Sequence, residues 1–219
     1  MASDWLALAL SYVYVFGVIA AAEGLRKRRR YSTDFTRKVI HIAVGMWSVG
    51  TVLLFDRWTM AVIPPLSFIP INYLSYRRET FKAMETGEKG NLGTIYFPLS
   101  FCFIIVLFWS RPHLLVASLM PMTWGDALAA VLGARYGQLR YTLWGSSRSL
   151  EGSVSMLLFA FAATALALWL FPPLALGPSL LYALIVALAA TLTEAITPWH
   201  LDNLTVPLIS AGVLYLLFS

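Results

Sequence analysis

The sequence has few charged residues and a single cysteine. Only 12% of its 219 residues are charged and 59% are hydrophobic, whereas about 25% of the residues of an ordinary soluble domain carry a charge. This shortage of charge excludes a water-soluble fold. Cys102 lies inside an apolar run, so an intrachain disulfide is excluded as well. The sequence also lacks a G-x-x-x-x-G-K-[ST] run, which excludes an ordinary P-loop.

Eight apolar runs, separated by charged residues or by proline and glycine clusters, make up most of the chain. Because a helix crosses the hydrocarbon core of a membrane with about 20 apolar residues, each run predicts a membrane-spanning helix. We expect an all-α, polytopic transmembrane bundle that forms one integral membrane domain over residues 1–219, with a peripheral first helix and basic loop at 1–35 and a core at 36–218. The predicted spans are 4–25, 36–55, 58–75, 92–109, 112–133, 152–171, 175–197 and 202–218.

Positive charges collect on one side of this arrangement. If the run from Arg26 to Arg30 is cytoplasmic, the inner connections and adjacent helix ends hold 14 basic residues and the outer ones hold only Arg57 and Arg111. Lys and Arg prefer the cytoplasmic side of a membrane. The bias therefore predicts an inner-membrane protein with both termini on the non-cytoplasmic side. It also explains the net charge of +5 without a nucleic-acid partner.

The acidic residues gather on the same side, which the orientation rule does not explain because acids contribute little to it. Asp126 lies within an apolar helix, where a charged side chain costs about 3 kcal/mol. Small residues recur every four positions from Gly125 to Gly137, a pattern that lets another helix approach closely. Pro121, about one turn earlier, removes a backbone hydrogen bond and permits a kink. We expect Asp126 to be functional, with a structural salt bridge to an arginine as the alternative.

Two further carboxylates, Glu194 and Asp202, lie near the inner ends of the last two spans. Together with Asp126 they predict a hard-cation site suited to Mg²⁺, which prefers oxygen ligands. Glu151 is another candidate metal ligand. Asp202 or Asn203 could instead cap the last helix, but capping does not explain Glu194.

The connection between residues 133 and 153 is rich in glycine, hydroxyl and arginine side chains. Glycines let backbone N–H groups converge on a phosphate, and the start of a helix adds a positive dipole end. This composition indicates an anion site, and it fits a flexible, positively charged connection equally well. The candidate phosphate-binding residues in this connection are Gly133, Gly137, Gly145, Arg148, Ser149 and Gly152.

A third group of polar residues lies at the start of the second span. Arg37, His41 and Gly45 share one helix face, and Lys38 precedes His41 by three positions. A lone histidine near a membrane interface is more often a packing or head-group contact than a functional group. Taken alone, this segment favours a structural role.

Together and in this order, these segments resemble the CTP-dependent polyprenol kinases, a family that includes phytol kinase and dolichol kinase and is related to the phosphatidate cytidylyltransferases. One departure is Arg148, where the family pattern has a lysine; arginine keeps the charge and can contact phosphate through two nitrogens. The resemblance spans about residues 36 to 208 and is carried by Arg37-Lys38 with His41 and Gly45, Glu88 to Pro98, Gly125-Asp126 with Gly133 and Gly137, Ser149 to Ser153, and Glu194 with Asp202-Asn203 and Pro207.

The resemblance implies a lipid kinase that transfers the γ-phosphoryl group of a nucleotide to a membrane-embedded isoprenoid alcohol such as phytol, geranylgeraniol or another polyprenol. It implies Mg²⁺ as cofactor and CTP as phosphoryl donor, with ATP as the alternative because nothing in the sequence separates the two. Such transfer depends on positioning and charge neutralisation. Asp126 is then expected to bind the metal or accept the hydroxyl proton. The implied metal ligands are Asp126, Glu151, Glu194 and Asp202, and the implied nucleotide contacts beyond the 133–153 connection are Lys38, His41, Asn91, Thr94 and Asn203.

The isoprenoid tail is expected between helices in the bilayer, beside the third span, where Pro64, Pro65 and Pro70 prevent a regular rod. A diacylglycerol kinase or a phosphatidate cytidylyltransferase could use the same metal site and remains an alternative. A secondary transporter is an alternative from another class, because transporters also hold intramembrane acids. Transporters, however, place their sites near the midplane between repeated halves, and this sequence has no convincing repeat. The oligomeric state is left open.

Overall fold

The computed structural model describes residues 3–84, 90–144, 146–171, 174–198 and 200–219. Within these ranges the chain is almost entirely helical, and each of the eight predicted spans is helical, several of them in more than one segment. The elements are α1 (Asp4–Arg29), α2 (Thr33–Leu54), α3 (Trp58–Ala61), α4 (Ile63–Arg78), α5 (Gly93–Phe108), α6 (Pro112–Met120), η1 (Pro121–Asp126), α7 (Ala127–Tyr136), β1 (Arg140–Leu143), β2 (Ser146–Ser149), α8 (Leu150–Leu170), α9 (Leu176–Ile196) and α10 (Asp202–Leu217).

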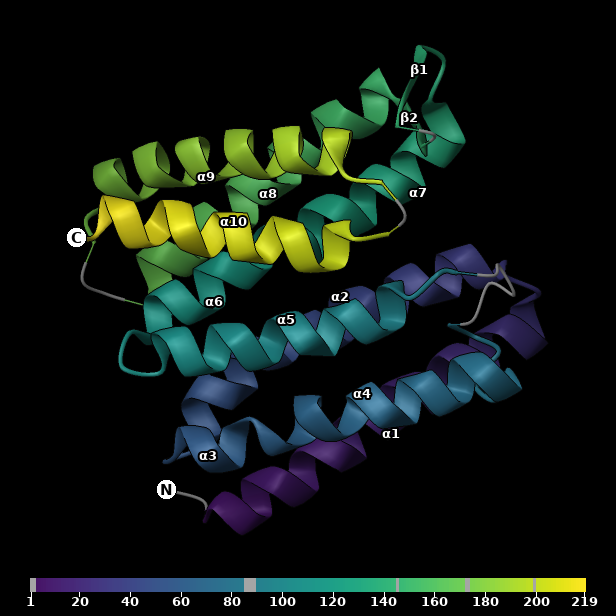
Figure 1. Cartoon of the computed structure of the whole chain (residues 1–219), viewed down its shortest axis with the longest axis horizontal. Helices are drawn as coiled ribbons and strands as arrows, with labels where there is room; N and C mark the ends of the chain where they lie inside the picture. Colours follow the sequence, from purple (N-terminus) through teal and green to yellow (C-terminus); the bar gives the residue numbers. More distant parts are fainter. Residues whose placement is uncertain (1–2, 85–89, 145, 172–173, 199) are drawn as a thin grey trace.

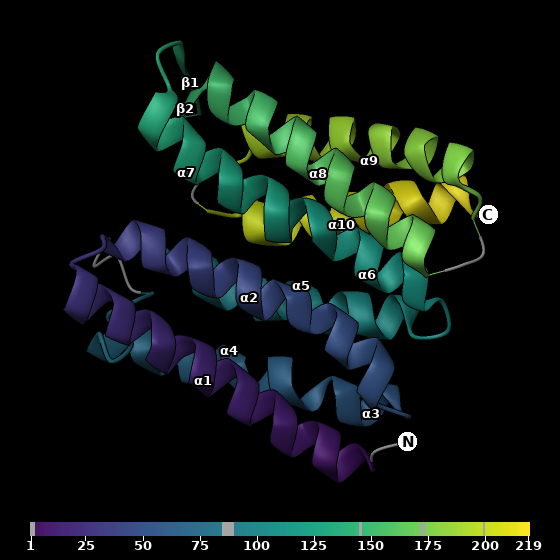
Figure 2. The ribbon, with the colours of Figure 1, turned by 180° about the vertical axis from the view of Figure 1, so that it is seen from behind.

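The all-α membrane bundle expected from the sequence is confirmed. Five segments of the described chain are long and apolar enough to cross a membrane: 4–28, 33–54, 112–136, 150–170 and 176–196. The helices α5 and α10 are shorter and also apolar. Figures 1 and 2 show both termini at one end of the bundle and the β1–β2 hairpin at the other. The side of the membrane on which the termini lie stays a prediction.

Local sequence signals explain where several helices begin and break. Ser3, Ser32 and Ser149 precede α1, α2 and α8, and each side chain accepts a hydrogen bond from a backbone N–H of the first turn, as N-cap residues do. The predicted third span is divided at Val62 into α3 and α4. The proline pair that follows Val62 lies in the first turn of α4, where the missing N–H groups have no helical partner to lose.

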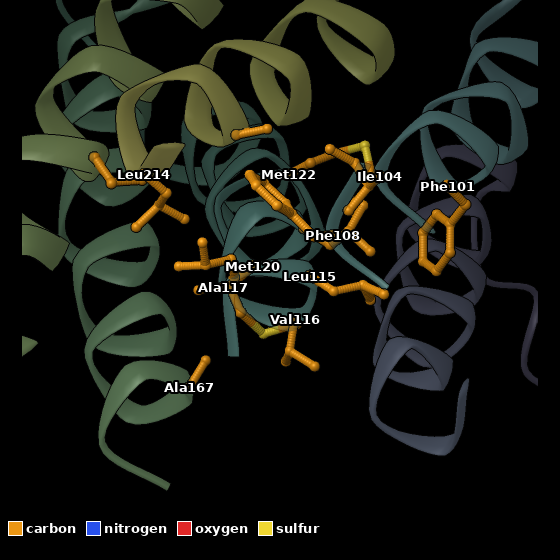
Figure 3. Packing of buried hydrophobic residues seen from close by; sticks show 14 of the residues in the cluster. Phe101, Ile104, Phe108, Leu115, Val116, Ala117, Met120, Met122, Ala167 and Leu214 are labelled. Atoms are coloured by element: carbon orange, nitrogen blue, oxygen red, sulfur yellow. The ribbon is translucent and has the colours of Figure 1, made fainter. Parts of the chain in front are cut away.

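The bundle has two halves that pack along α5. The helices α1 to α5 form one half, and α6 to α10, with η1, form the other (Figures 1 and 2). The main core lies between the halves, where Ile104 and Phe108 of α5 are buried with Leu115 of α6 and Leu214 of α10 (Figure 3). A smaller cluster joins α1, α2 and α4 through residues that include Val15, Ile40 and Phe68.

The outer surface of the second half is apolar as well. Leu158 of α8 and Leu181 and Leu192 of α9 are more than half exposed. In water such a surface would drive aggregation, but in a bilayer it contacts lipid tails at no hydrophobic cost. The exposed side chains therefore agree with the composition in indicating a membrane environment.

The connection between α7 and α8 contains an antiparallel hairpin that the sequence did not predict. Strand β1 pairs with β2 in a register that sets Arg140 opposite Ser149 and Leu143 opposite Ser146. The hairpin gives the connection a defined shape, in place of the flexible loop that was one of its two interpretations. Tyr141 and Thr142 favour extended backbone, but four residues surrounded by glycine and serine are too short a signal to stand out. The predicted phosphate ligand Gly145 lies outside the described residues.

Candidate active site

Three acidic side chains meet where three helical segments converge. Asp126 ends η1, Glu194 lies in the last turn of α9, and Asp202 begins α10. All three are buried, and one carboxylate oxygen from each lies within 4.8 Å of the others. The sequence predicted that these three acids share a site, and the fold brings them together.

A turn of π-helix sets the direction of Asp126. The helix that starts as α6 widens to η1 between Pro121 and Asp126 and then returns to α-geometry as α7. The kink expected at Pro121 therefore takes the form of a π-turn, a feature that occurs often at functional sites because it redirects side chains within a continuous helix.

The small-residue stripe beside Asp126 packs against α8, as predicted. A methyl group at Gly125 would lie 2.6 Å from Sδ of Met156, and one at Gly133 would lie 3.0 Å from Oγ of Ser149. Neither position can hold a larger side chain without displacing its neighbour. The stripe therefore lets α7 and α8 approach closely, while Asp126 turns to α2.

Lys38 and His41 of α2 lie next to Asp126. The Nζ of Lys38 donates a hydrogen bond of 2.7 Å to Oδ2 of Asp126. The Nε2 of His41 is 2.9 Å from the backbone oxygen of Met122 and 3.9 Å from the same Oδ2. This contact means that His41 is fixed against the π-turn, which provides a structural role for the histidine in addition to its proximity to the acid.

Arg148 of β2 holds the other two carboxylates. Its guanidinium forms an ion pair with Glu194, donates a hydrogen bond of 2.9 Å to the backbone oxygen of Thr197, and lies 3.5 Å from Oδ2 of Asp202. The cluster thus contains three carboxylates and two cations, Arg148 and Lys38. The converging carboxyl oxygens are the kind of ligand that a hard divalent cation such as Mg²⁺ prefers.

A polar pocket of about 270 Å³ opens on one side of this cluster. The hairpin, α7 and the start of α8 form its walls, and Asp126 and Glu194 lie at its base. Its further polar and small side chains are those of Gly133, Arg140, Ser147, Arg148, Ser149 and Gly152. Hydroxyl, guanidinium and glycine backbone groups around one cavity are suited to phosphate groups.

An apolar cleft opens on the other side, between α1, α2, α4 and α5. Its volume, measured in the same way, is about 130 Å³, and one side of it is open. Val15, Val44, Phe68 and Phe97 are among the apolar residues that line it. Its polar end is formed by Lys38, His41, Thr94, Asp202 and Asn203.

The predicted nucleotide ligands are therefore divided between two cavities. Gly133, Arg148, Ser149 and Gly152 line the polar pocket, whereas Lys38, His41, Thr94 and Asn203 line the polar end of the apolar cleft. Two others have local structural contacts: a methyl group at Gly137 would lie 2.6 Å from Oγ of Ser149, and Oδ1 of Asn91 accepts a hydrogen bond of 3.3 Å from the backbone N–H of Gly93.

Glu151 does not join the other three acids. Its carboxylate accepts hydrogen bonds of 3.0 Å from the backbone N–H of Gln138 and 3.2 Å from that of Leu139. It therefore fastens the chain just before the hairpin to the first turn of α8. The role of Glu151 as a metal ligand stays a prediction; in this structure its carboxylate is bound to the chain before the hairpin and is not among the three acids that converge.

Three residues of the site were not predicted from the sequence. Ser147 lines the polar pocket, the backbone oxygen of Thr197 accepts a hydrogen bond from Arg148, and Nδ2 of Asn72 donates one of 2.7 Å to the backbone oxygen of Thr94. Ser147 and Thr197 are ordinary polar residues in connections, which carry no signal of their own. Asn72 could have been predicted, because it lies inside an apolar span and a buried amide needs a hydrogen-bond partner.

This arrangement defines a class of protein: a helical membrane protein in which a carboxylate centre joins a basic polar pocket to a long apolar cleft. Comparison with known proteins gives the family. The chain is 31% identical over 213 residues to the phytol kinase of Synechocystis sp., which covers 94% of this chain and 89% of that protein. It is 25% identical over 234 residues to the farnesol kinase of Arabidopsis thaliana, with 99% of this chain and 76% of that protein covered.

The chain belongs to the phytol and farnesol kinase family. A probable phytol kinase of Oryza sativa is also similar, with 29% identity over 239 residues. The resemblance noted in the sequence is thus confirmed for the isoprenoid-alcohol kinases. No protein-family profile and no solved structure matches the chain.

Proposed function

We propose that this protein is a kinase that transfers the γ-phosphoryl group of a nucleotide to the hydroxyl group of a membrane-embedded isoprenoid alcohol. One observation carries the proposal. Asp126 lines the polar pocket, Lys38 lines the apolar cleft, and their side chains are joined by the 2.7 Å hydrogen bond. A water-soluble donor in the pocket and a lipid acceptor in the cleft would therefore meet at this pair.

The polar pocket suits the phosphates of the donor. Arg140 and Arg148 supply positive charge, and Ser147 and Ser149 supply hydroxyl groups. Arg148 is already held by Glu194 and Thr197, so little freedom is lost when it binds an anion. CTP as the donor rests on the family resemblance, and ATP is the alternative that the assay below separates from it.

Asp126, Glu194 and Asp202 would hold Mg²⁺. A bound Mg²⁺ would neutralise charge on the transferred phosphoryl group. Lys38 holds the Asp126 carboxylate at the boundary of the two cavities, and Arg148 does the same for Glu194. The protein's own contribution is therefore a fixed arrangement of charge, which is the main requirement of phosphoryl transfer.

In the proposed reaction, a bond forms between the alcohol oxygen and the γ-phosphorus while the bond from the γ-phosphorus to the bridging oxygen breaks. The products are a lipid monophosphate and a nucleoside diphosphate. The hydroxyl proton passes to a carboxylate of the cluster, of which Asp126 is the one at the boundary of the two cavities. Thr94 and Asn203 lie at the polar end of the cleft, and within the described residues Oγ1 of Thr94 and Oδ1 of Asn203 are buried without a hydrogen-bond partner. We propose that they orient the alcohol.

The site would face the cytoplasm from the inner membrane. The hairpin lies at the end of the bundle opposite the two termini (Figure 1), and the connections and adjacent helix ends expected on the cytoplasmic side hold 14 of the 16 basic residues. Nucleotide and Mg²⁺ are available there. A tag on either terminus should therefore be accessible only from the opposite side of the membrane.

The test is incubation of the purified protein in detergent with Mg²⁺, γ-labelled CTP or ATP, and phytol, geranylgeraniol, farnesol, dolichol or diacylglycerol. Label is expected in one or more isoprenoid alcohols. Label in diacylglycerol alone would overturn the proposal in favour of a diacylglycerol kinase. Release of pyrophosphate with a CMP-lipid would identify a cytidylyltransferase, and solute uptake by proteoliposomes without nucleotide turnover would identify a transporter.

A further inference from the structure

The apolar cleft has a built floor at the end remote from the acid cluster. Thr51 near the end of α2 and Ala61 of α3 line the cleft there, and each is at most 3% exposed. The short helix α3 lies at the same end of the bundle as the N-terminus (Figure 2). The lining of the cleft therefore extends as far as α3.

The floor is fixed in position by a buried acid of α1. Oδ2 of Asp4 accepts a hydrogen bond of 2.6 Å from Nε of Arg57, and Oδ1 of Asp4 accepts one of 2.8 Å from the backbone N–H of Asp56. Arg57 is the residue immediately before α3. These contacts hold the start of α3 against α1, so the floor has little freedom to move away from a long ligand.

The depth of the cleft can be measured along α2. Thr51 follows His41 by ten residues and Lys38 by thirteen, which correspond to about 15 Å and about 20 Å at the rise of an α-helix. With carbon–carbon bonds of about 1.5 Å and tetrahedral angles, an extended main chain gains about 1.25 Å per bond. The 16-carbon main chain of a C20 isoprenoid would thus extend about 20 Å, and the 12-carbon main chain of a C15 isoprenoid about 15 Å.

We infer that the cleft measures the length of the alcohol, and that the floor of Thr51 and Ala61 limits the substrate to about 20 carbons. The inference rests on the proposed function. A C20 chain with its hydroxyl near Lys38 would bring its last isoprene unit to the floor. A C15 chain would end one unit above it, and a longer polyprenol could not lie straight in the cleft and would have to leave it through the open side.

The first test uses the unaltered protein and needs no substitution. Alcohols of 10, 15, 20, 25 and 45 carbons are supplied singly at equal concentration, and kcat/KM for lipid phosphate formation is measured for each. We expect activity up to 20 carbons and a decrease of at least about tenfold at 25, since a pocket discriminates one excess methylene group by about 10–200-fold. Equal activity on the 45-carbon alcohol would refute the length limit and leave the kinase function intact.

The second test raises the floor. Ala61→Leu and, separately, Thr51→Leu should lower kcat/KM for the C20 alcohol by at least about tenfold relative to the C15 alcohol. Val44→Phe, nearer the middle of the cleft, should lower both to a similar extent. Met60→Leu is the matched control, because Met60 adjoins Ala61 but does not line the cleft and this exchange conserves volume.

The ratio of C15 to C20 activity within one preparation is the measured quantity, so a partly unfolded sample does not alter it. An unchanged ratio in both floor variants would overturn the inference. If every alcohol, including the C10 alcohol, stays unlabelled with the unaltered protein, the proposed kinase function fails instead. The two failures are therefore distinguishable.

Discussion

Neutralising the Lys38–Asp126 pair should separate its contribution to stability from its contribution to catalysis. The two side chains are 13% and 8% exposed, and Nζ and Oδ2 are 2.7 Å apart. At an effective dielectric constant of about 20, their attraction is about 6 kcal/mol before the cost of desolvation. Removing one partner of a buried ion pair costs about 3–5 kcal/mol, because the other charge is left uncompensated. Asp126→Asn and Lys38→Met should each lower the unfolding temperature in detergent.

The double variant, Asp126→Asn with Lys38→Met, buries no uncompensated charge from this pair and should recover much of the lost stability. Its activity should stay as low as that of Asp126→Asn, at least about 100-fold below the unaltered protein, since loss of a proton acceptor costs about 10²–10⁴-fold. Thermal unfolding and the labelled-phosphate assay are measured on the same samples. A double variant that regains both stability and activity would refute the catalytic role and leave the pair a structural salt bridge.

Other substitutions test the remaining parts of the site. Arg148→Lys should raise KM for the nucleotide about tenfold with a smaller change in kcat, because lysine cannot contact two oxygens in a fixed plane; an unchanged KM would exclude the phosphate contact. Asp202→Asn should raise the Mg²⁺ concentration needed for half-maximal activity by about 10–100-fold. Glu151→Gln should leave this concentration unchanged and increase proteolysis at the hairpin. If Glu151→Gln raises the Mg²⁺ requirement and Asp202→Asn does not, Glu151 is the metal ligand. Gly125→Leu should destabilise the protein by about 1–3 kcal/mol, as measured by thermal unfolding. Gly17→Leu, on the open face of α1, is the control. If the two variants are equally stable, η1 does not pack closely on α8.

The membrane passes could be predicted because their signal is local. A run of apolar residues long enough to cross a bilayer needs no knowledge of its neighbours. All eight runs are helical, and five of the described segments are long and apolar enough to cross a membrane. The spacing from Gly125 to Gly137 likewise predicted a close helix contact, which α8 provides. The observed helix boundaries differ from the predicted ones at capping residues and prolines. The cap at Ser32, for example, starts α2 three residues earlier than expected.

The approach of Asp126, Glu194 and Asp202 to one another was predicted from a physical argument about charge. A carboxylate in an apolar helix needs a partner, and three of them at one end of a bundle imply a common neutralising group. The partners themselves could not be assigned from sequence. Lys38 was expected to hold phosphate and instead pairs directly with Asp126, since its position opposite the π-turn depends on how α2 packs in three dimensions.

The division of the predicted ligands between two cavities was beyond the sequence. Thr94 and Arg148 both have side chains that can contact a phosphate group. Only the fold decides that Thr94 lines the apolar cleft and Arg148 lines the polar pocket. Glu151 shows the same limitation in reverse. An acid near a helix start can bind a metal or accept backbone N–H groups, and the hairpin that supplies those groups left too weak a pattern to be recognised.

The π-turn between Pro121 and Asp126 makes the length of this helix as important as its composition. A π-turn holds one residue more than the α-turn that it replaces, and each residue of an α-helix rotates the chain by about 100°. Loss of one residue here would let the helix become regular while the segments on either side keep their own packing preferences. The acid and the glycine stripe could then no longer face their separate partners at once, so this segment should tolerate exchanges of apolar side chains better than any change in its number of residues.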